Sequence, residues 1–264
     1  MKIAVNVQGK GTPWVFLHGW GMHKSIWRPV TDALHEQTST PVQTLTLDLP
    51  GFGRSGWQTN LAQFDAMVDA VERCLTAQVS TPLYLVGWSM GGLIAQALAL
   101  RGNLSVNGLV LVASTPKFTE AEQWPGIQAR VLAMFQKQLK LDFSATIARF
   151  LAVQAMGSPQ TREDIRTIQQ LLADAPPPHP EALAAGLAWL EQVDLRREFN
   201  AITCPSMRIY GKRDSLVPVK QCERIDKQND SALIYEQSAH TPFLNELPRF
   251  VADLLAFGYR TQTH

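Results

Sequence analysis

The sequence predicts an α/β protein in which a mainly parallel central sheet is flanked by helices and carries an inserted helical cap. Short apolar runs bounded by Gly, Pro, Asn or Asp alternate with helix-patterned stretches over most of the chain, as expected for a sheet buried on both faces. Between residues 116 and 189 the alternation stops, and helical patterns and a proline-rich stretch take its place. A helical block between two strands of one sheet is most simply an insertion at the carboxyl edge of that sheet.

The expected strands and helices follow one another in a regular order. Apolar runs predict strands at residues 14–17, 44–49, 83–86, 109–112, 207–210 and 233–235. Helical periodicity predicts core helices at residues 62–75, 93–100 and 250–257, and cap helices at residues 128–139, 145–156 and 162–172. The predicted core therefore comprises residues 1–115 and 190–264, and the predicted cap comprises residues 116–189. With 264 residues, 45% of them hydrophobic, the chain is long enough to bury a core of this size.

Charge and cysteine content argue against several classes of protein. Lys and Arg number 24 against 23 Asp and Glu, so the formal net charge of +1 gives no overall attraction to nucleic acid or to an anionic membrane. Cys74, Cys204 and Cys222 are widely spaced and odd in number, which disfavours a disulfide framework or a structural zinc site. The first residues lack a signal-peptide pattern, and no apolar run approaches the ~20 residues that cross a bilayer. We therefore expect a cytoplasmic protein with neither a nucleic-acid nor a membrane partner.

The sharpest motif is Gly87-Trp88-Ser89-Met90-Gly91, between the predicted strand 83–86 and the predicted helix 93–100. A serine on a tight strand-to-helix turn needs small neighbours two residues away, because side chains there would clash. Gly87 and Gly91 meet this requirement. The motif predicts that Ser89 is a nucleophile, and the flanking elements make a mere glycine-rich surface turn the weaker interpretation.

A serine nucleophile needs a base, and the base needs an acid that orients it. His240 follows the last predicted strand, and Asp214 lies just beyond the strand that ends at residue 210. Each alone would more often be structural, but the order Ser89, Asp214, His240 matches one of the known serine triads. Asp194 is the next candidate for the acid.

Attack on an ester carbonyl also needs donors for the oxyanion that forms. The backbone N–H of Met90, directly after the nucleophile, is the first expected donor. The segment His18-Gly19-Trp20-Gly21 follows the strand 14–17, and its glycines would let the N–H of Trp20 approach as the second donor. We interpret His18 as a structural residue that orients this loop.

A second glycine motif, Gly51-Phe52-Gly53-Arg54-Ser55-Gly56, has the spacing of a dinucleotide-binding loop. Pro50 precedes it, no small-residue helix begins at its third glycine, and it lies outside the first strand–helix–strand unit. We therefore interpret it as a tight turn at the rim of the site. No metal or organic cofactor is required by the motifs.

Taken together, the motifs resemble the α/β-hydrolase superfamily over essentially the whole chain. The cap makes the resemblance more specific, because several of its segments are similar to those of the pimeloyl-[acyl-carrier protein] methyl ester esterases. The similar segments are Trp124-Pro125-Gly126-Ile127, Arg149-Phe150-Leu151-Ala152, Gln154-Ala155-Met156-Gly157 and Val193-Asp194-Leu195-Arg196. They occur together with the two core motifs, His18-Gly19-Trp20-Gly21 and Gly87-Trp88-Ser89-Met90-Gly91-Gly92.

The resemblance implies cleavage of the methyl ester of pimeloyl-carrier protein with release of methanol. It also implies a set of residues that contact the acyl chain and its ester: Trp20, Ser89, Met90, Phe150, Leu151, Ala152, Val153, Gln154 and His240.

The resemblance further implies that basic cap residues dock the acidic acyl-carrier protein, and Arg149, Arg162 and Arg166 match the family's arginines in spacing. Ala145 stands where another arginine is expected, so one carrier contact is missing. The residues themselves allow such a surface, because six basic and three acidic side chains lie between residues 130 and 170. Arg162 and Arg166, four apart, share one helix face. Ordinary solvated helix charges remain an equally good interpretation without the resemblance.

The resulting hypothesis is a monomeric serine carboxylesterase of biotin biosynthesis that needs no cofactor. A broad short-chain esterase, a thioesterase and a carbon–carbon bond hydrolase remain open, since all can use this triad. A non-catalytic ligand receptor on the same fold is the alternative from a different class of protein.

Overall fold

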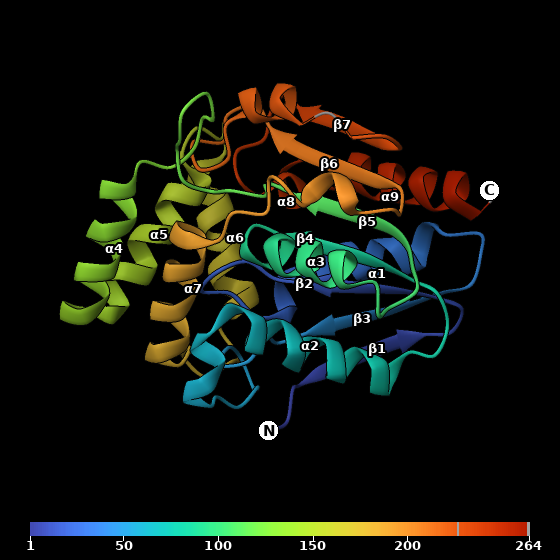
Figure 1. Ribbon diagram of the computed structural model, residues 1–264, viewed down its shortest axis with the longest axis horizontal. Coiled ribbons are helices and arrows are strands. Elements are labelled where there is room, and N and C mark those ends of the chain that lie inside the picture. Colours follow the sequence, from blue (N-terminus) through green and yellow to red (C-terminus); the bar gives the residue numbers. More distant parts are fainter. Residues whose placement is uncertain (226, 263–264) are drawn as a thin grey trace.

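A seven-stranded sheet forms the centre of the computed structural model, which describes residues 1–225 and 227–262 (Figure 1). Its strands lie in the order β1-β3-β2-β4-β5-β6-β7, with β1 antiparallel to β3 and all other pairs parallel. The strands are β1 (Val5–Gly9), β2 (Thr12–Leu17), β3 (Val42–Leu47), β4 (Leu83–Trp88), β5 (Val106–Val112), β6 (Ser206–Gly211) and β7 (Asp230–Tyr235). Each of the six predicted strands overlaps one of β2 to β7.

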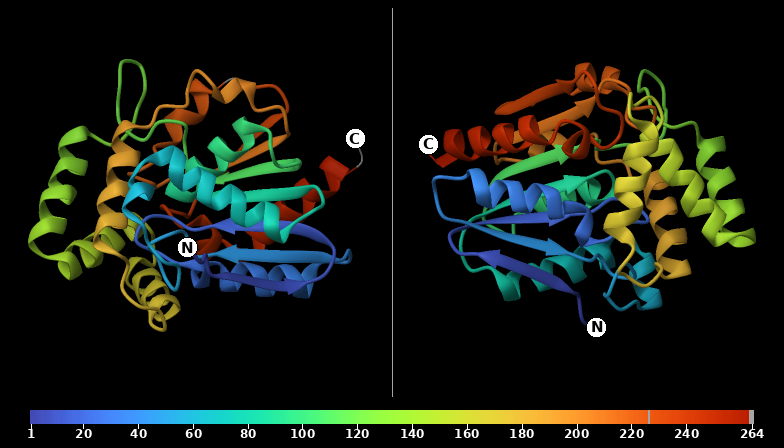
Figure 2. Two further views of the ribbon diagram at one scale, coloured as in Figure 1. Left: turned by 60° about the horizontal axis from the view of Figure 1, so that its bottom comes forward. Right: turned by 180° about the vertical axis from the view of Figure 1, so that it is seen from behind.

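Helices cover both faces of the sheet, so the sheet has a hydrophobic core on each side (Figure 2). One face is covered by α1 (Arg28–Gln37), α8 (Pro242–Asn245) and α9 (Leu247–Gln262), and the other by α2 (Phe64–Gln78) and α3 (Met90–Arg101). Burial on both faces explains why β4 is buried along its whole length and reads as a nearly continuous apolar run.

The strand β1 was not predicted from the sequence. This strand lies at the edge of the sheet, and four of its five residues are exposed. An exposed edge strand does not need a continuous apolar run, so the pattern that predicts the buried strands is absent from it.

The cap consists of α4 (Ala129–Leu141), α5 (Phe143–Ala155), α6 (Thr161–Leu172) and α7 (Pro180–Gln192), which lie together at the left of Figure 1. The first three agree with the predicted cap helices to within two residues. The fourth, α7, follows the proline-rich stretch and begins with Pro180, whose fixed φ suits the first turn of a helix.

The two segments that join the cap to the core lie side by side. The backbone N–H of Leu195 donates to the carbonyl of Pro116 at 2.9 Å. Lys117 and Asp194 form an ion pair at 3.3 Å. The chain therefore leaves the core after β5 and returns to it before β6 through two segments that contact each other.

Candidate active site

Ser89 lies on a sharp turn between β4 and α3. Its φ of 54° falls in the left-handed region that residues with a side chain rarely adopt, and such strain is concentrated at functional sites. A Cβ on Gly87 would lie 2.5 Å from Cα of Gly92, and one on Gly91 would lie 2.5 Å from the carbonyl oxygen of His18. The two glycines of the motif are therefore required by close backbone approach, as the sequence predicted.

Asp214 and His240 come from neighbouring loops that follow β6 and β7. The loops are joined directly, because the N–H of Arg213 donates to the carbonyl of Ser238 at 3.0 Å. Nδ1 of His240 lies 2.7 Å from Oδ2 of Asp214, and both side chains are buried. The other carboxylate oxygen of Asp214 accepts the N–H groups of Leu216 and Val217 at 2.8 and 3.0 Å. The Asp214 carboxylate is thus fixed by its own loop and aimed at the imidazole.

The alternative acid, Asp194, lies elsewhere, in one of the two segments that join the cap to the core. Arg196 binds its carboxylate with two hydrogen bonds of 2.8 Å. Hydrogen bonds from Arg196 and Lys117 lower the pKa of Asp194 to about 2. Of the two candidates, Asp214 is the one that the fold places against His240.

The hydrogen bond to Asp214 assigns the proton of His240 to Nδ1, because a carboxylate can only accept. This leaves Nε2 as an acceptor, and Nε2 is buried without a hydrogen-bond partner among residues 1–225 and 227–262. Consequently, no hydrogen bond joins it to Ser89 in this structure. A serine–histidine bond is often long in a ligand-free enzyme and tightens when substrate binds.

Two further residues bind the backbone of His240, and neither was predicted to have this role. The indole N–H of Trp88 donates to the carbonyl of His240 at 2.8 Å. The N–H of His240 donates to the carbonyl of Gln154 in α5 at 3.2 Å. Trp88 lies inside the serine motif, so its position was a usable signal. The contact with Gln154 has no local signal in the sequence.

The loop after β2 lies against the serine turn, as the hypothesis of an oxyanion hole requires. Met90 is the first residue of α3, where backbone N–H groups have no acceptor within the helix. Trp20 is fully buried, and a Cβ on Gly19 would lie 3.0 Å from the ring of Trp88. The assignment of Trp20 and Met90 as donors stays a prediction, and the placement of both residues is compatible with it.

His18 supports this loop rather than pointing at the serine. Its Nδ1 donates to the carbonyl of Gly19 at 2.8 Å, and its Nε2 accepts the N–H of Leu49 at 2.9 Å. Burial lowers the pKa of His18 from 6.5 to about 4, so its imidazole is neutral at pH 7. This is the structural role that we expect from the sequence.

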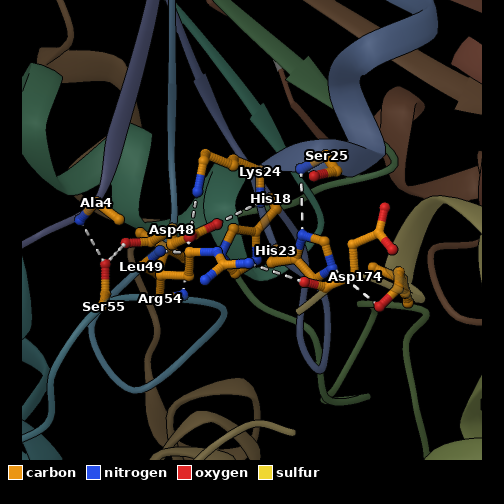
Figure 3. A network of polar contacts seen from close by, with 11 residues as sticks. Ala4, His18, His23, Lys24, Ser25, Asp48, Leu49, Arg54, Ser55 and Asp174 are labelled. Carbon is orange, nitrogen blue, oxygen red and sulfur yellow. Dashed lines mark hydrogen bonds and ion pairs between the residues drawn. The ribbon is translucent and has the colours of Figure 1, made fainter. Parts of the chain in front are cut away.

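The second glycine motif folds around a buried carboxylate, that of Asp48 (Figure 3). This carboxylate accepts the N–H and the ammonium group of Lys24 and the N–H of Arg54, at 2.8, 2.5 and 2.9 Å. Burial raises the pKa of Asp48, but these hydrogen bonds outweigh it and hold the pKa below its usual range. A Cβ on Gly53 would collide with the Asp48 side chain. The loop that contains the second glycine motif therefore binds the carboxylate of Asp48.

The same network reaches the cap, as Figure 3 shows. The guanidinium of Arg54 donates to the carbonyl of Asp174 at 3.1 Å, and Nε2 of His23 donates to the carbonyl of Leu172 at 3.3 Å. The end of α6 is therefore fastened to the loops that flank the site.

Of the five residues of α5 that are predicted to contact substrate, some lie beside Trp20 or His240 and others do not. Phe150 is buried and packs edge-on against Trp20, with ring centroids 4.5 Å apart, and Gln154 is buried beside His240. Val153 is half-buried against the same hydrophobic cluster as Trp20. Leu151 belongs to the cluster on the other face, and Ala152 is exposed. The role of all five in binding substrate stays a prediction.

The three arginines assigned to carrier docking lie on adjacent cap helices, Arg149 on α5 and Arg162 and Arg166 on α6. All three are exposed, as a docking surface requires. In the described part of the chain, no group of three His, Cys, Asp or Glu side chains could hold a metal ion, and none of the helices is long and apolar enough to span a bilayer.

Comparison with known proteins relates this chain to esterases. A family model described as "alpha/beta hydrolase fold" matches residues 12–247. The "Pimeloyl-[acyl-carrier protein] methyl ester esterase" of Vibrio cholerae is 38% identical over 262 residues, covering 98% of this chain and 99% of that protein. The protein of the same name from Vibrio parahaemolyticus is 40% identical, covering 95% of each chain.

A solved esterase from Exiguobacterium antarcticum has the same fold. It superposes with a TM-score of 0.86 at 24% identity, over 97% of this chain and 94% of that one. At this level of identity the likeness concerns the fold alone.

Proposed function

Since this chain belongs to the alpha/beta hydrolase fold family, and within it to the pimeloyl-[acyl-carrier protein] methyl ester esterases, we propose that it hydrolyses the methyl ester of pimeloyl-acyl-carrier protein in biotin biosynthesis. The observation that carries the chemistry is the 2.7 Å contact between His240 and Asp214. The backbone of His240 is in turn bonded by Trp88, the residue before Ser89 on its strained turn. This arrangement supports a serine carboxylesterase that works without a cofactor.

In the first half of the reaction, Nε2 of His240 accepts the proton of Ser89 as Oγ attacks the ester carbonyl carbon. The carbonyl oxygen becomes an oxyanion, which the N–H groups of Trp20 and Met90 stabilise. Asp214 holds the imidazole in the required tautomer and stabilises its positive charge. The imidazolium then donates its proton to the departing methoxide, so methanol leaves and an acyl-enzyme remains.

In the second half, water attacks the acyl-enzyme and gives a proton to Nε2 of His240. The second oxyanion uses the same two N–H groups, and its collapse returns the proton to Oγ of Ser89. The free carboxyl group of the pimeloyl chain and an unchanged enzyme result.

The cap, which we propose to comprise residues 116–189, supplies the remaining parts of the site. Phe150, Leu151, Ala152, Val153 and Gln154 are proposed to contact the acyl chain. Arg149, Arg162 and Arg166 are proposed to dock the acidic carrier protein, because they are exposed and lie on neighbouring helices. A cytoplasmic location and a monomeric state are further proposals, which cell fractionation and sedimentation would test.

Hydrolysis of pimeloyl-carrier protein methyl ester tests this function directly when it is measured beside p-nitrophenyl esters of graded chain length. We expect a kcat/KM on the carrier-bound ester well above that on every nitrophenyl ester. A preference for short nitrophenyl esters would favour a broad carboxylesterase, and faster cleavage of an acyl thioester would favour a thioesterase. Failure to release any nitrophenol, even as a single-turnover burst, would favour a ligand receptor.

A further inference from the structure

We propose that Gly186, in the cap helix α7, is a positioning residue for the oxyanion hole. This inference rests on the proposed function and adds a residue to it that the motifs do not contain. Because Gly186 has no side chain, Trp20 and Met90, the two proposed donor residues, can pack directly against α7. The cap helix is thereby part of the catalytic framework as well as a cover over the substrate.

The space at Gly186 is occupied by the two donor residues themselves. A Cβ at this position would lie 2.6 Å from Cδ1 of Trp20 and 2.9 Å from Sδ of Met90. Real Cβ atoms essentially never come this close to other atoms, so one or both side chains would have to move. Trp20 and Met90 are fully buried, and close-packed interiors leave little room for such movement.

A hydrogen bond one turn earlier fixes the same contact. The indole N–H of Trp20 donates to the carbonyl of Leu183 in α7 at 2.9 Å. Leu183 and Gly186 are three residues apart and therefore lie on one face of the helix. Trp20 is thus held by α7 at two points, a hydrogen bond and a steric contact.

Helix propensity does not explain glycine at position 186, so a steric requirement is the better explanation. Alanine occupies positions 182, 184, 185 and 188 of the same helix, and glycine is a weaker helix former than alanine. Gly186 lies in the interior of α7, so it serves neither as a cap nor as a turn. With alanine at position 186, α7 could not pack as closely against Trp20 and Met90.

The consequence for the reaction follows from how an oxyanion hole works. Its donors must be preorganised at the position that the oxyanion will occupy, and loss of one donor typically lowers kcat by about 10²–10³-fold. A methyl group at Gly186 pushes on Trp20 and Met90 without removing either N–H. We therefore expect Gly186→Ala to lower kcat by roughly 10- to 100-fold, with KM for a small ester changed by less than about threefold.

The test is steady-state hydrolysis of p-nitrophenyl butyrate by Gly186→Ala, with Gly258→Ala as the matched control. Gly258 also lies inside a helix against a tryptophan, since its Cβ would be 2.9 Å from Cζ2 of Trp14. Trp14 is near the start of β2, away from the serine turn. The control variant Gly258→Ala should have a lower melting temperature than the wild type, as Gly186→Ala should, but its kcat should equal that of the wild type.

A double-mutant cycle shows whether the effect passes through Trp20. In a Trp20→Ala background the obstructing ring is absent, so adding Gly186→Ala should lower kcat by less than about threefold. If Gly186→Ala fails to fold, Trp20→Phe replaces it, because this variant keeps a ring but loses the bond to Leu183. We expect Trp20→Phe to lower kcat, and its pH profile to match that of the wild type because His240 is untouched.

Three outcomes would overturn the proposal: an unchanged kcat in folded Gly186→Ala, an equal loss in Gly258→Ala, or full additivity with both Trp20→Ala and Met90→Ala, which remove the two side chains that the methyl group would meet. In each of these cases Ser89→Ala would still be inactive, so the proposed esterase would stand. A wild-type protein that hydrolyses no ester would instead remove the proposed function itself.

Discussion

The backbone N–H of His240 donates a hydrogen bond to the carbonyl oxygen of Gln154, at 3.2 Å. The proposed base is therefore tied to the end of the cap helix α5. Just beyond that end, the carbonyl of Gly157 accepts a hydrogen bond of 3.3 Å from Arg213, the residue before Asp214. The cap thus contacts both loops that carry the acid–base pair.

This contact predicts a loss of activity when the end of α5 is displaced. Gly157 has a φ of +95°, and a Cβ there would lie 2.9 Å from the carbonyl oxygen of Arg213. We expect Gly157→Ala to lower kcat on a nitrophenyl ester roughly fivefold, because the acid–base pair is moved from its aligned position. Gly102→Ala is the control, since Gly102 also has a positive φ (+67°) but nothing within 4 Å of the added methyl. Gly102→Ala should lower the stability of the protein without lowering kcat. Equal losses of kcat in Gly102→Ala and Gly157→Ala would contradict the proposal that the end of α5 aligns the acid–base pair.

Removal of the proposed nucleophile or base should abolish hydrolysis without unfolding the protein. Ser89→Ala and His240→Ala should each lower kcat/KM by about 10⁴-fold or more, and the double variant should be scarcely worse, because triad members act as a unit. Nitrophenyl ester assays and circular dichroism on one preparation measure both properties. Substantial turnover by Ser89→Ala would mean that another residue is the nucleophile.

The proposed acid is tested by a matched pair of substitutions. Asp214→Asn should lower kcat by about 10³- to 10⁴-fold, because His240 loses the anion that sets its tautomer. Asp194→Asn should leave kcat within about twofold, since Asp194 is engaged by Arg196 and Lys117 and surface ion pairs contribute little. A reversed ranking in a direct comparison of kcat would reassign the acid.

Replacement of Arg149, Arg162 and Arg166 by alanine should slow hydrolysis of the carrier-bound ester selectively. We expect kcat/KM on that substrate to fall about tenfold or more, while turnover of a nitrophenyl ester stays within about twofold, since exposed charges act mainly on association. Higher salt should reduce the advantage of the wild type, because such charges are screened within ~10 Å at 0.1 M. Equal losses on both substrates would show that the arginines stabilise the cap instead.

Acid should destabilise the protein partly through His18. Its pKa is about 4 in the folded state against 6.5 when unperturbed, chiefly because of burial, and burial also lowers the pKa of His23. Between pH 6.5 and 4 the unfolded chain binds protons that the folded chain does not. The free energy of unfolding therefore falls as pH falls through this window, by up to about 3 kcal/mol for His18.

Urea titrations at several pH values measure this effect. His18→Asn should be less stable than the wild type at pH 7.5, because the bonds to Gly19 and Leu49 are altered, but it should lose less stability on going to pH 5. A pH dependence as steep as that of the wild type would exclude His18 as a source of the acid sensitivity.

The sequence by itself determined the features that depend on local patterns. Buried strands were predicted because a strand covered on both faces must be apolar throughout. Gly87, Ser89 and Gly91 were recognisable because the constraints of the tight turn act within five consecutive residues. The helices α4, α5 and α6 were predicted because they carry periodic apolar faces.

Only the tertiary structure decided which distant residues meet. The choice between Asp214 and Asp194 as the partner of His240 depended on loop contacts, since Asp214 follows a predicted strand and Asp194 follows the predicted end of the cap, and neither position shows which residue meets the histidine. The contact of Gln154 with His240 and that of Gly186 with Trp20 join the cap to the core across many residues of chain. Neither leaves a local pattern, because a backbone carbonyl belongs to every residue, and the need for a missing side chain depends on what packs against it.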